Sequence, residues 1–148
     1  NNMKISTKGR YGLRALVDIA ANGENGPVPL AQVAGRQKIS LNYLEQVFGI
    51  LRKADLVVSV KGASGGYRLA RDMDDITVKE VLEALEGRFS ITDFPDSSPE
   101  DPVQKALKEL LWDVIDKRVN EFLEARTLGQ LVREYQRKKE AGTVMYYI

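Results

Sequence analysis

The chain has 148 residues, 43% of them hydrophobic and 29% charged, which is enough to bury the core of one domain of ordinary size. It contains no cysteine and no histidine, and this excludes disulfides, thiolate or imidazole metal sites, and histidine-based acid–base catalysis. The net charge of +1 hides an asymmetry, because residues 1–71 hold 11 Lys and Arg against 4 Asp and Glu, whereas residues 72–148 hold 11 against 17. The basic half favours binding to a polyanion, and the acidic half favours a separate role in assembly or regulation.

Three helices and a hairpin are predicted in the first half. Apolar residues at helical spacing indicate helices over residues 11–22 and 30–36, and Ser40 is a good N-cap for a third helix over residues 41–54. Two short β-rich runs follow, LVVSVKG and GYRLAR, and the glycine-rich loop between them is typical of a hairpin. Three helices followed by a two-stranded hairpin is the order of a winged helix-turn-helix, in which the third helix enters the DNA major groove.

The second half is predicted to be helical. A capping box that begins at Thr77 opens a fourth helix, which Gly87 closes, and a second box at Thr127 opens a last helix to about Ala141. Between them, Ser98-Pro99 begins a long helix to about Ala125. The predicted fold class is mainly α with a small β-hairpin wing and a long C-terminal dimerisation helix. Its parts are a winged helix-turn-helix DNA-binding domain over residues 3–87, a linker over 88–102, a helical dimerisation region over 103–142 and a tail over 143–148.

The chemistry suited to DNA contact lies on the basic half. Asn42 and Gln46 face outward on the third helix and carry paired donor and acceptor groups that suit adenine edges, whereas Arg52 near its end suits a phosphate. The cation of Lys61 stands on a loop tip without bulk, and hydroxyls and cations at the start of the first helix favour a phosphate. The residues predicted to contact DNA are Ser6, Thr7, Lys8, Arg10, Ser40, Asn42, Tyr43, Glu45, Gln46, Arg52, Lys61 and Ser64.

Each of these features has a plainer explanation when it is taken alone. A polar helix face is by default a solvated face, a glycine-rich hairpin loop is more often only a turn, and Glu45 fits a solvated helix charge as well as a base contact. The uneven charge can arise by chance. The order of all these parts on the basic half is what favours DNA binding.

The segments STKGRYGLRALVDIA, ISLNYLEQVFGILRKADLV and SVKGASGGYRLAR resemble the Rrf-two family of bacterial winged-helix transcription regulators, most closely over residues 3–86. The resemblance implies that Asn42, Tyr43, Glu45 and Gln46 fall on base-reading positions. Lys61 stands where the family often has an arginine, so the charge is kept but the fork geometry is lost. The best-known branch holds an iron–sulfur cluster on three cysteines and a histidine. Because this chain has neither residue type, the sequence predicts no such cluster, no metal and no other cofactor.

The resemblance also implies a homodimer on a palindromic operator, in which the long helix packs against its mate and against the partner's first helix. A broad apolar stripe along the long helix supports this expectation, and the alternative is a stripe that only covers its own domain's core. The residues predicted to form the interface are Leu107, Leu110, Leu111, Val114 and Phe122, and Trp112 fits either core or interface.

The last residues of the sequence are apolar and aromatic, whereas a solvated tail is usually polar. Such an end either docks back on the dimer body or is captured by a partner protein through its carboxylate. A cysteine-free branch of the family, the cysteine-metabolism repressors of Gram-positive bacteria, ends similarly, and its partner is O-acetylserine thiol-lyase, the cysteine synthase. That resemblance implies a cytoplasmic repressor of sulfur and cysteine metabolism genes, whose enzyme-binding residues are Met145, Tyr146, Tyr147 and Ile148.

Two alternatives stay open. One is a regulator of the same family that senses another ligand or none, and the other is an interaction protein that holds an enzyme and has lost DNA binding. The basic first half argues against the second alternative. An enzyme is not predicted, because no Asp or Glu stands in a recognisable acid–base arrangement. Membrane insertion is not predicted either, because no apolar run approaches the roughly 20 residues that span a bilayer.

Overall fold

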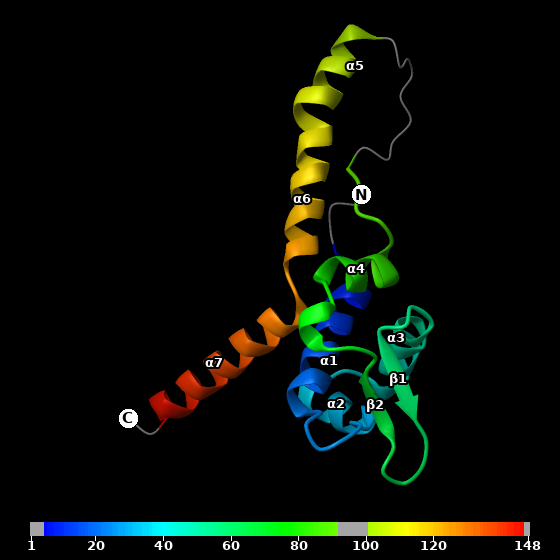
Figure 1. Cartoon of the computed structure of the whole chain (residues 1–148), viewed down its shortest axis with the longest axis vertical. Helices are drawn as coiled ribbons and strands as arrows, with labels where there is room; N and C mark the ends of the chain where they lie inside the picture. The colour runs from blue at the N-terminus through cyan, green and yellow to red at the C-terminus, as the bar shows by residue number, and fades with distance from the viewer. Residues whose placement is uncertain (1–4, 92–100, 147–148) are drawn as a thin grey trace.

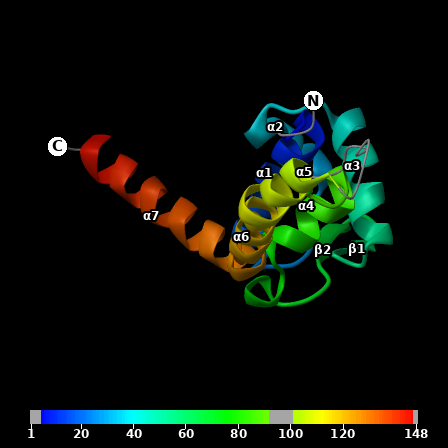
Figure 2. The same ribbon diagram turned by 90° about the horizontal axis from the view of Figure 1, so that it is seen from above.

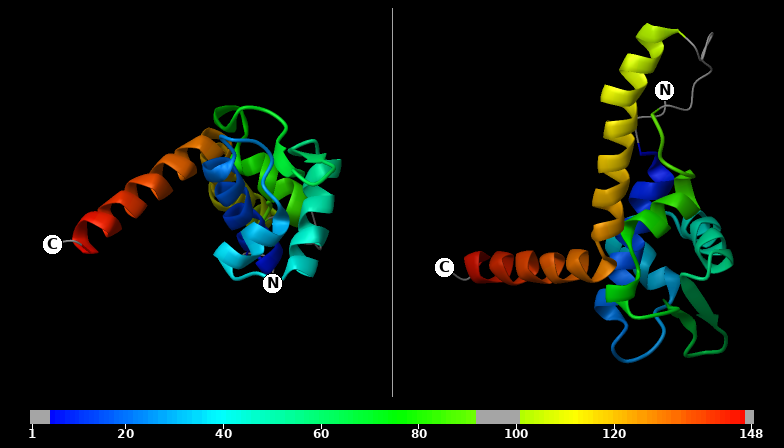
Figure 3. Two further views of the ribbon diagram at one scale, coloured as in Figure 1. Left: turned by 90° about the horizontal axis from the view of Figure 1, so that it is seen from below. Right: turned by 45° about the horizontal axis from the view of Figure 1, so that its top comes forward.

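The chain forms a winged helical body, from which a long helix rises and a last helix turns away. The computed structural model describes residues 5–91 and 101–146, with side chains as far as Thr143. In Figure 1, α5 and α6 form one column above the body, and α7 leaves the foot of that column at a wide angle; Figure 3 shows the same arrangement from two further sides. The elements in chain order are α1 (Thr7–Asn22), α2 (Leu30–Gln37), α3 (Leu41–Lys53), β1 (Val57–Val60), β2 (Gly66–Leu69), the 3-10 turn η1 (Met73–Asp75), α4 (Val78–Glu86), α5 (Pro102–Leu107), the π-helical turn η2 (Lys108–Trp112), α6 (Asp113–Ala125) and α7 (Leu128–Tyr146).

Local sequence signals set where several helices begin and end. The Ser40 hydroxyl caps α3 by accepting a hydrogen bond from the backbone N–H of Tyr43 at 3.3 Å. Thr77 and Glu80 form the reciprocal capping box that was predicted for α4, and this helix ends at Gly87, where φ is 89°. The predicted order of three helices, a hairpin and a fourth helix is confirmed.

The wing is a two-stranded antiparallel hairpin with another backbone segment against its edge. β1 pairs with β2, with Val57 opposite Leu69. Val28, in the loop after α1, exchanges two backbone hydrogen bonds of 2.9 Å with Tyr67 of β2. Because Val28 lies just before α2, this bridge fixes the wing relative to the helix-turn-helix.

One hydrophobic core joins the body, and the start of α7 belongs to it. Burial of each large apolar side chain stabilises the fold by roughly 1.5–3 kcal/mol. Because Leu128 and Val132 are buried, the start of α7 is packed into the body, whereas the C-terminal end of the helix projects from it (Figure 2). The core side chains include Leu16, Ile19, Val33, Leu44, Phe48, Leu51, Val57, Val81, Leu128 and Val132.

The junction between α6 and α7 is fastened to the segment before α4. The backbone N–H of Val78 donates to the carbonyl of Arg126 at 2.8 Å, and an isolated β-bridge joins Thr77 to Thr127. Thr127 also forms, with Gln130, the second predicted capping box. The starts of α4 and α7 therefore lie against each other, and backbone pairing sets the direction in which α7 leaves.

The end of α7 differs from the sequence prediction. The helix passes through Gly142 and continues to Tyr146, instead of ending near Ala141. A glycine inside a helix costs only about 1 kcal/mol relative to alanine, so a single glycine without further stop signals does not have to end it.

The long helix also differs from its prediction. Asp101 caps it, because the aspartate carboxylate accepts from the N–H of Val103 at 2.8 Å, and Pro102 occupies the first helical position. The predicted start at Ser98-Pro99 lies outside the described residues. The π-helical turn η2 within this helix was not predicted, since no sequence rule distinguishes it from a regular turn.

Candidate nucleic-acid interface

α3 lies on the side of the body away from α7 (Figures 1 and 2), and it carries an exposed polar face. Asn42, Glu45 and Gln46 are exposed on this face, whereas Leu44 and Val47 on the other face are buried in the core. Asn42 and Gln46 are four residues apart and therefore stand one turn from each other on the helix. Side-chain amides of this kind can form paired hydrogen bonds with base edges when a helix enters a major groove.

Tyr43 is half-buried and packs against another tyrosine. Its ring meets that of Tyr11 of α1 edge to face, with centroids 6.0 Å apart and planes at 88°. The guanidinium carbons of Arg10 and Arg14 lie 5.7 and 5.6 Å from the centroid of the Tyr11 ring. We call these four residues the tyrosine–arginine cluster; it joins the first half of α1 to the start of α3. Tyr11 and Arg14 were not predicted from the sequence, because a contact between two helices has no short sequence pattern.

The wing tip is exposed and carries a cation. Lys61 and Ser64 are both exposed there. The tip turns at Gly62, where φ is 107°, and the carbonyl of Gly62 accepts from the N–H of Gly65 at 3.0 Å. Arg68 on β2 is exposed as well and adds a second cation that the sequence analysis had not selected.

The start of α1 is occupied by a carboxylate from the same chain. Glu86 of α4 accepts hydrogen bonds from the hydroxyl of Ser6 and from the N–H of Gly9, the latter at 2.7 Å. Burial acts to raise the pKa of Glu86, but these hydrogen bonds and the charge of Lys8 outweigh it and hold the pKa below its ordinary value. The chain itself thus supplies an anion at the helix start for which a phosphate was predicted.

The predicted DNA-contacting residues lie on three parts of the body, namely the start of α1, α3 with its N-cap, and the wing. The Tyr11–Tyr43 contact joins α1 to α3, and α3 packs against β1 of the wing. Lys38 adds a further exposed cation in the turn before α3; its φ of 56° is unusual for a lysine, so the sequence did not indicate this turn geometry. Apart from the half-buried Tyr43, all the predicted residues are exposed, namely Ser6, Thr7, Lys8, Arg10, Ser40, Asn42, Glu45, Gln46, Arg52, Lys61 and Ser64.

A second surface, along α5, η2 and α6, is apolar. Leu110 is 81% exposed and Phe122 57% exposed, so these side chains do not cover the core of their own chain. Trp112 is half-buried, so its exposure does not decide between the core and the dimer interface, the two positions that its sequence context allowed. We call the exposed members the α5–α6 stripe: Val103, Leu107, Leu110, Leu111, Val114 and Phe122.

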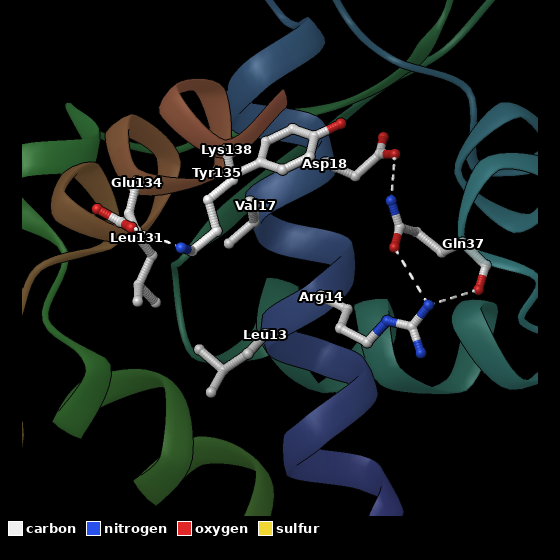
Figure 4. A pocket seen from close by; sticks show the side chains of 9 residues that line it. All are labelled: Leu13, Arg14, Val17, Asp18, Gln37, Leu131, Glu134, Tyr135 and Lys138. Carbon is white, nitrogen blue, oxygen red and sulfur yellow. Dashed lines mark hydrogen bonds and ion pairs between the residues drawn. The ribbon is translucent and has the colours of Figure 1, made fainter. Parts of the chain in front are cut away.

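An apolar groove of about 360 Å³ lies between α1 and α7 (Figure 4). Leu13 and Val17 of α1 face Leu131 and Tyr135 of α7 across it, and Arg14, Asp18, Gln37, Glu134 and Lys138 complete its lining. The groove lies on the α7 side of the body, away from the polar face of α3.

A buried carboxylate, Asp18, lies at one edge of this groove with only 1% of its surface exposed. Arg36 donates to its two oxygens at 2.7 and 2.9 Å, and the amide of Gln37 donates to it at 2.9 Å. The guanidinium of Arg14 in turn donates to the backbone carbonyl of Gln37 at 2.9 Å. These bonds hold the end of α2, and hence the turn before α3, against α1. The hydrogen bond to Asp18 raises the pKa of Arg36, so the guanidinium stays ionised.

Three other sequence predictions concern the C-terminal tail, metal binding and membrane insertion. The predicted enzyme-binding residues Met145, Tyr146, Tyr147 and Ile148 lie beyond the last described side chain. Within residues 5–91 and 101–146, no three acidic side chains stand close enough to hold a metal ion. In the same ranges, no helix combines the length and apolar character that crossing a bilayer requires.

Comparison with known proteins identifies the family. The sequence model of the Rrf2 family, described as "Iron-dependent Transcriptional regulator", matches residues 5–134. The transcriptional regulator IscR of Photobacterium profundum is 41% identical over 140 residues, which cover 95% of this chain and 81% of that protein. The solved structure of CymR (YrzC) of B. subtilis is 39% identical with a TM-score of 0.77, covering 89% of this chain and 98% of that one. The structure of T. potens IscR is 41% identical with a TM-score of 0.71, covering 90% and 88%.

The iron dependence in the family description does not fit the residues present. An iron–sulfur cluster is held by cysteine thiolates, in some centres with histidine, and this chain contains neither residue type. The winged helix-turn-helix fold and the length of the matched sequence fit the family throughout. The chain therefore belongs to the Rrf2 family of DNA-binding transcriptional regulators, and it is not an enzyme.

Proposed function

We propose that the chain binds a palindromic DNA operator as a homodimer, with α3 of each protomer in a major groove and the wing against the neighbouring backbone or minor groove. The observation that carries this proposal is the exposed polar face of α3, formed by Asn42, Glu45 and Gln46, on a helix that lies beside the wing (Figure 1). Asn and Gln read base edges by paired hydrogen bonds, and the cation of Lys61 contributes a contact that is independent of sequence.

The homodimer part of the proposal is supported by the α5–α6 stripe. A large apolar side chain gains roughly 1.5–3 kcal/mol when it is buried, so a row of exposed ones is costly in an isolated protomer. A second copy offers the same stripe and, between α1 and α7, an apolar groove that side chains of the first copy would fill. A two-fold dimer also presents two copies of α3, as a palindromic operator requires.

The experiment is selection of a DNA sequence followed by gel shifts. The unmodified chain is used to enrich double-stranded oligonucleotides from a random pool, and the enriched sequence serves as the probe. Asn42→Ala or Gln46→Ala is expected to lose about 1–3 kcal/mol of discrimination between the probe and random DNA. Lys61→Ala is expected to weaken binding to both and to lower the salt dependence by about one unit.

A matched control is Lys117→Ala, which removes an exposed cation from α6, on the other part of the molecule. This variant should bind the probe as the unmodified chain does. Enrichment of no sequence, together with no shift at low salt, would refute DNA binding and would favour the alternative of an interaction protein without a DNA target.

We further propose that the regulated genes belong to sulfur and cysteine metabolism, that the chain represses them in the cytoplasm, and that O-acetylserine thiol-lyase is its partner. The structural likeness to CymR, the global cysteine regulator of B. subtilis, supports this assignment. The absence of cysteine and histidine also supports it, because it leaves a partner or a small molecule as the signal in place of a cluster. A regulator of the same family that senses another ligand is the competing assignment, since relatives named IscR are similarly close.

Deletion of Tyr147 and Ile148 tests the partner. The deleted chain should lose binding to the purified enzyme in a pull-down, and O-acetylserine should release the enzyme from the complex with the unmodified chain. A deletion of the same residues that leaves enzyme binding intact contradicts the partner assignment without touching DNA binding. An absence of any effect of O-acetylserine favours the regulator with another ligand.

A further inference from the structure

Tyr43 differs from the other base-reading candidates on α3 because it is not fully exposed. Asn42, Glu45 and Gln46 stand in solvent, whereas Tyr43 is half-buried and its ring rests edge to face on Tyr11, 6.0 Å away. Such pairs attract each other beyond the area that they bury, and they have a preferred geometry. The direction in which the Tyr43 side chain leaves α3 is therefore set partly by a residue of α1.

Tyr11 is itself held in place by charged neighbours. The Arg14 guanidinium lies 5.6 Å from the Tyr11 centroid and donates to the Gln37 carbonyl at 2.9 Å, so one end of Arg14 is anchored at the end of α2. Figure 4 shows this hydrogen bond at the edge of the groove between α1 and α7. Arg10 lies against the same ring at 5.7 Å.

The anchor continues into the interior of the body. Gln37 donates its amide to Asp18 at 2.9 Å, and Asp18 is buried and paired with Arg36. A contiguous series of contacts thus runs from Asp18 through Gln37, Arg14 and Tyr11 to Tyr43 on the DNA-facing side. Asp18, Gln37 and Arg14 also line the groove, so the series begins at one surface and ends at another.

We infer that Tyr11 and Arg14 are positioning residues for DNA recognition: they hold the Tyr43 side chain in its place on α3 and fix that place relative to the α1–α7 groove. The inference rests on the proposed reading of DNA by α3 and adds two specificity-determining residues on α1, which do not themselves need to touch a base. A side chain that leaves its preferred direction loses contacts with one or two base positions, while the phosphate contacts of the remaining cations persist.

The test uses the full-length chain and the oligonucleotide that the unmodified chain enriches from a random pool. Tyr11→Leu removes the ring but keeps an apolar side chain, and Tyr11→Phe keeps the ring. Tyr11→Leu is expected to lower the ratio of probe binding to random-DNA binding by about tenfold and to blur the base preference at one or two positions of a repeated selection. Tyr11→Phe should restore most of that ratio.

Arg14→Lys separates positioning from a direct phosphate contact. It keeps the charge but cannot reproduce the planar guanidinium that lies against Tyr11 and bonds Gln37. If Arg14 positions Tyr11, the salt dependence stays unchanged and the specificity ratio falls. Phe89→Leu, which alters a half-buried aromatic residue outside the cluster, is the control and should leave the ratio unchanged.

Three results would overturn the inference. The first is a Tyr11→Leu variant with an unchanged specificity ratio, and the second is an Arg14→Lys variant that equals the unmodified chain. The third is a Tyr11→Leu variant whose only change is a lower melting temperature, which would show that the cluster stabilises the fold without affecting DNA recognition. Failure of the unmodified chain to enrich any sequence would instead refute the proposed function, and this inference with it.

Discussion

At the scale of single residues, Glu86 connects the end of α4 to the start of α1 and makes stability depend on pH. Its pKa is lowered in the folded chain from an ordinary value of 4.5, although burial alone would raise it, because Ser6 and Gly9 donate hydrogen bonds to the carboxylate. The ionised form therefore contributes stability above that ordinary pKa, and the contribution is lost as the pH falls through the lowered pKa. Glu86→Gln should thus reduce the free energy of unfolding at neutral pH more than at about pH 3.

Urea titrations at the two pH values measure this difference. Glu83→Gln is the control, because Glu83 is an exposed carboxylate on the same helix and bonds neither Ser6 nor Gly9 in the described structure. A Glu86→Gln variant that loses the same free energy of unfolding at both pH values would show that the carboxylate acts there only as a hydrogen-bond acceptor of fixed strength.

Residues whose role is local were predictable from the sequence, and residues whose role depends on a distant partner were not. Ser40, Thr77 and Thr127 cap helices through the backbone N–H three residues further on, so short patterns identify them. Glu86 meets the start of α1 from 77 residues away, at Gly9, and only the fold brings the two together. Tyr11 of α1 likewise contacts Tyr43 of α3, and no spacing pattern in the sequence indicates a contact between these two helices.

At the scale of elements, the wing depends on two glycines that have different roles. At Gly66, where φ is 151°, an added Cβ would overlap the Val28 carbonyl and lie 2.6 Å from the nitrogen of Pro29, neither of which can move without breaking the bridge to Tyr67. At Gly62, where φ is 107°, an added Cβ meets nothing within 4 Å. Gly62→Ala should cost only the backbone strain, about 1–2 kcal/mol, whereas Gly66→Ala should cost at least about 2 kcal/mol more.

Thermal and urea unfolding of the two variants measure how much stability each substitution loses. Equal destabilisation by Gly62→Ala and Gly66→Ala would show that the edge contact with Val28 adds nothing to the strain at Gly66. A wing that has lost the Val28 bridge should also expose the amide of Tyr67, so hydrogen exchange at that amide is expected to rise in Gly66→Ala alone.

The helices and strands were predictable from the sequence where the periodicity of apolar residues and the turn-forming residues indicated the same boundaries. The helical spacing of apolar residues and the glycine-rich loops predicted the three helices and the hairpin in the right order. Disagreement arose where one signal stood alone, as at Gly142, through which α7 continues. The turn η2 was not predictable because a π-helical turn differs from an α-helical turn in hydrogen bonding and not in composition.

At the scale of the whole molecule, the polar face of α3, which is the proposed DNA-contacting surface, and the exposed apolar stripe lie on different elements. The exposed face of α3 and the wing lie opposite α7, and the α5–α6 stripe lies on the column above the body. The pairing of Thr77 with Thr127 fixes the foot of α7 to the body, and the α1–α7 groove lies beyond this attachment. A partner in that groove would lie next to Asp18 and Gln37, at the interior end of the contacts that lead to Tyr43.

Leu110→Glu tests assembly without disturbing the protomer. Leu110 is 81% exposed, so the change should leave the free energy of protomer folding within about 0.5 kcal/mol. In a dimer that buries the stripe, each copy would instead bring an unpaired carboxylate into an apolar interface. The dissociation constant of the dimer should then rise by at least about 100-fold. Sedimentation should then show monomers at concentrations where the unmodified chain is dimeric, and operator affinity should fall because one protomer reads only one half-site. Lys117→Glu, which places the same charge at an exposed site outside the stripe, is the control. A Leu110→Glu variant that remains dimeric would place the interface elsewhere and leave the exposure of the stripe to be explained by another partner.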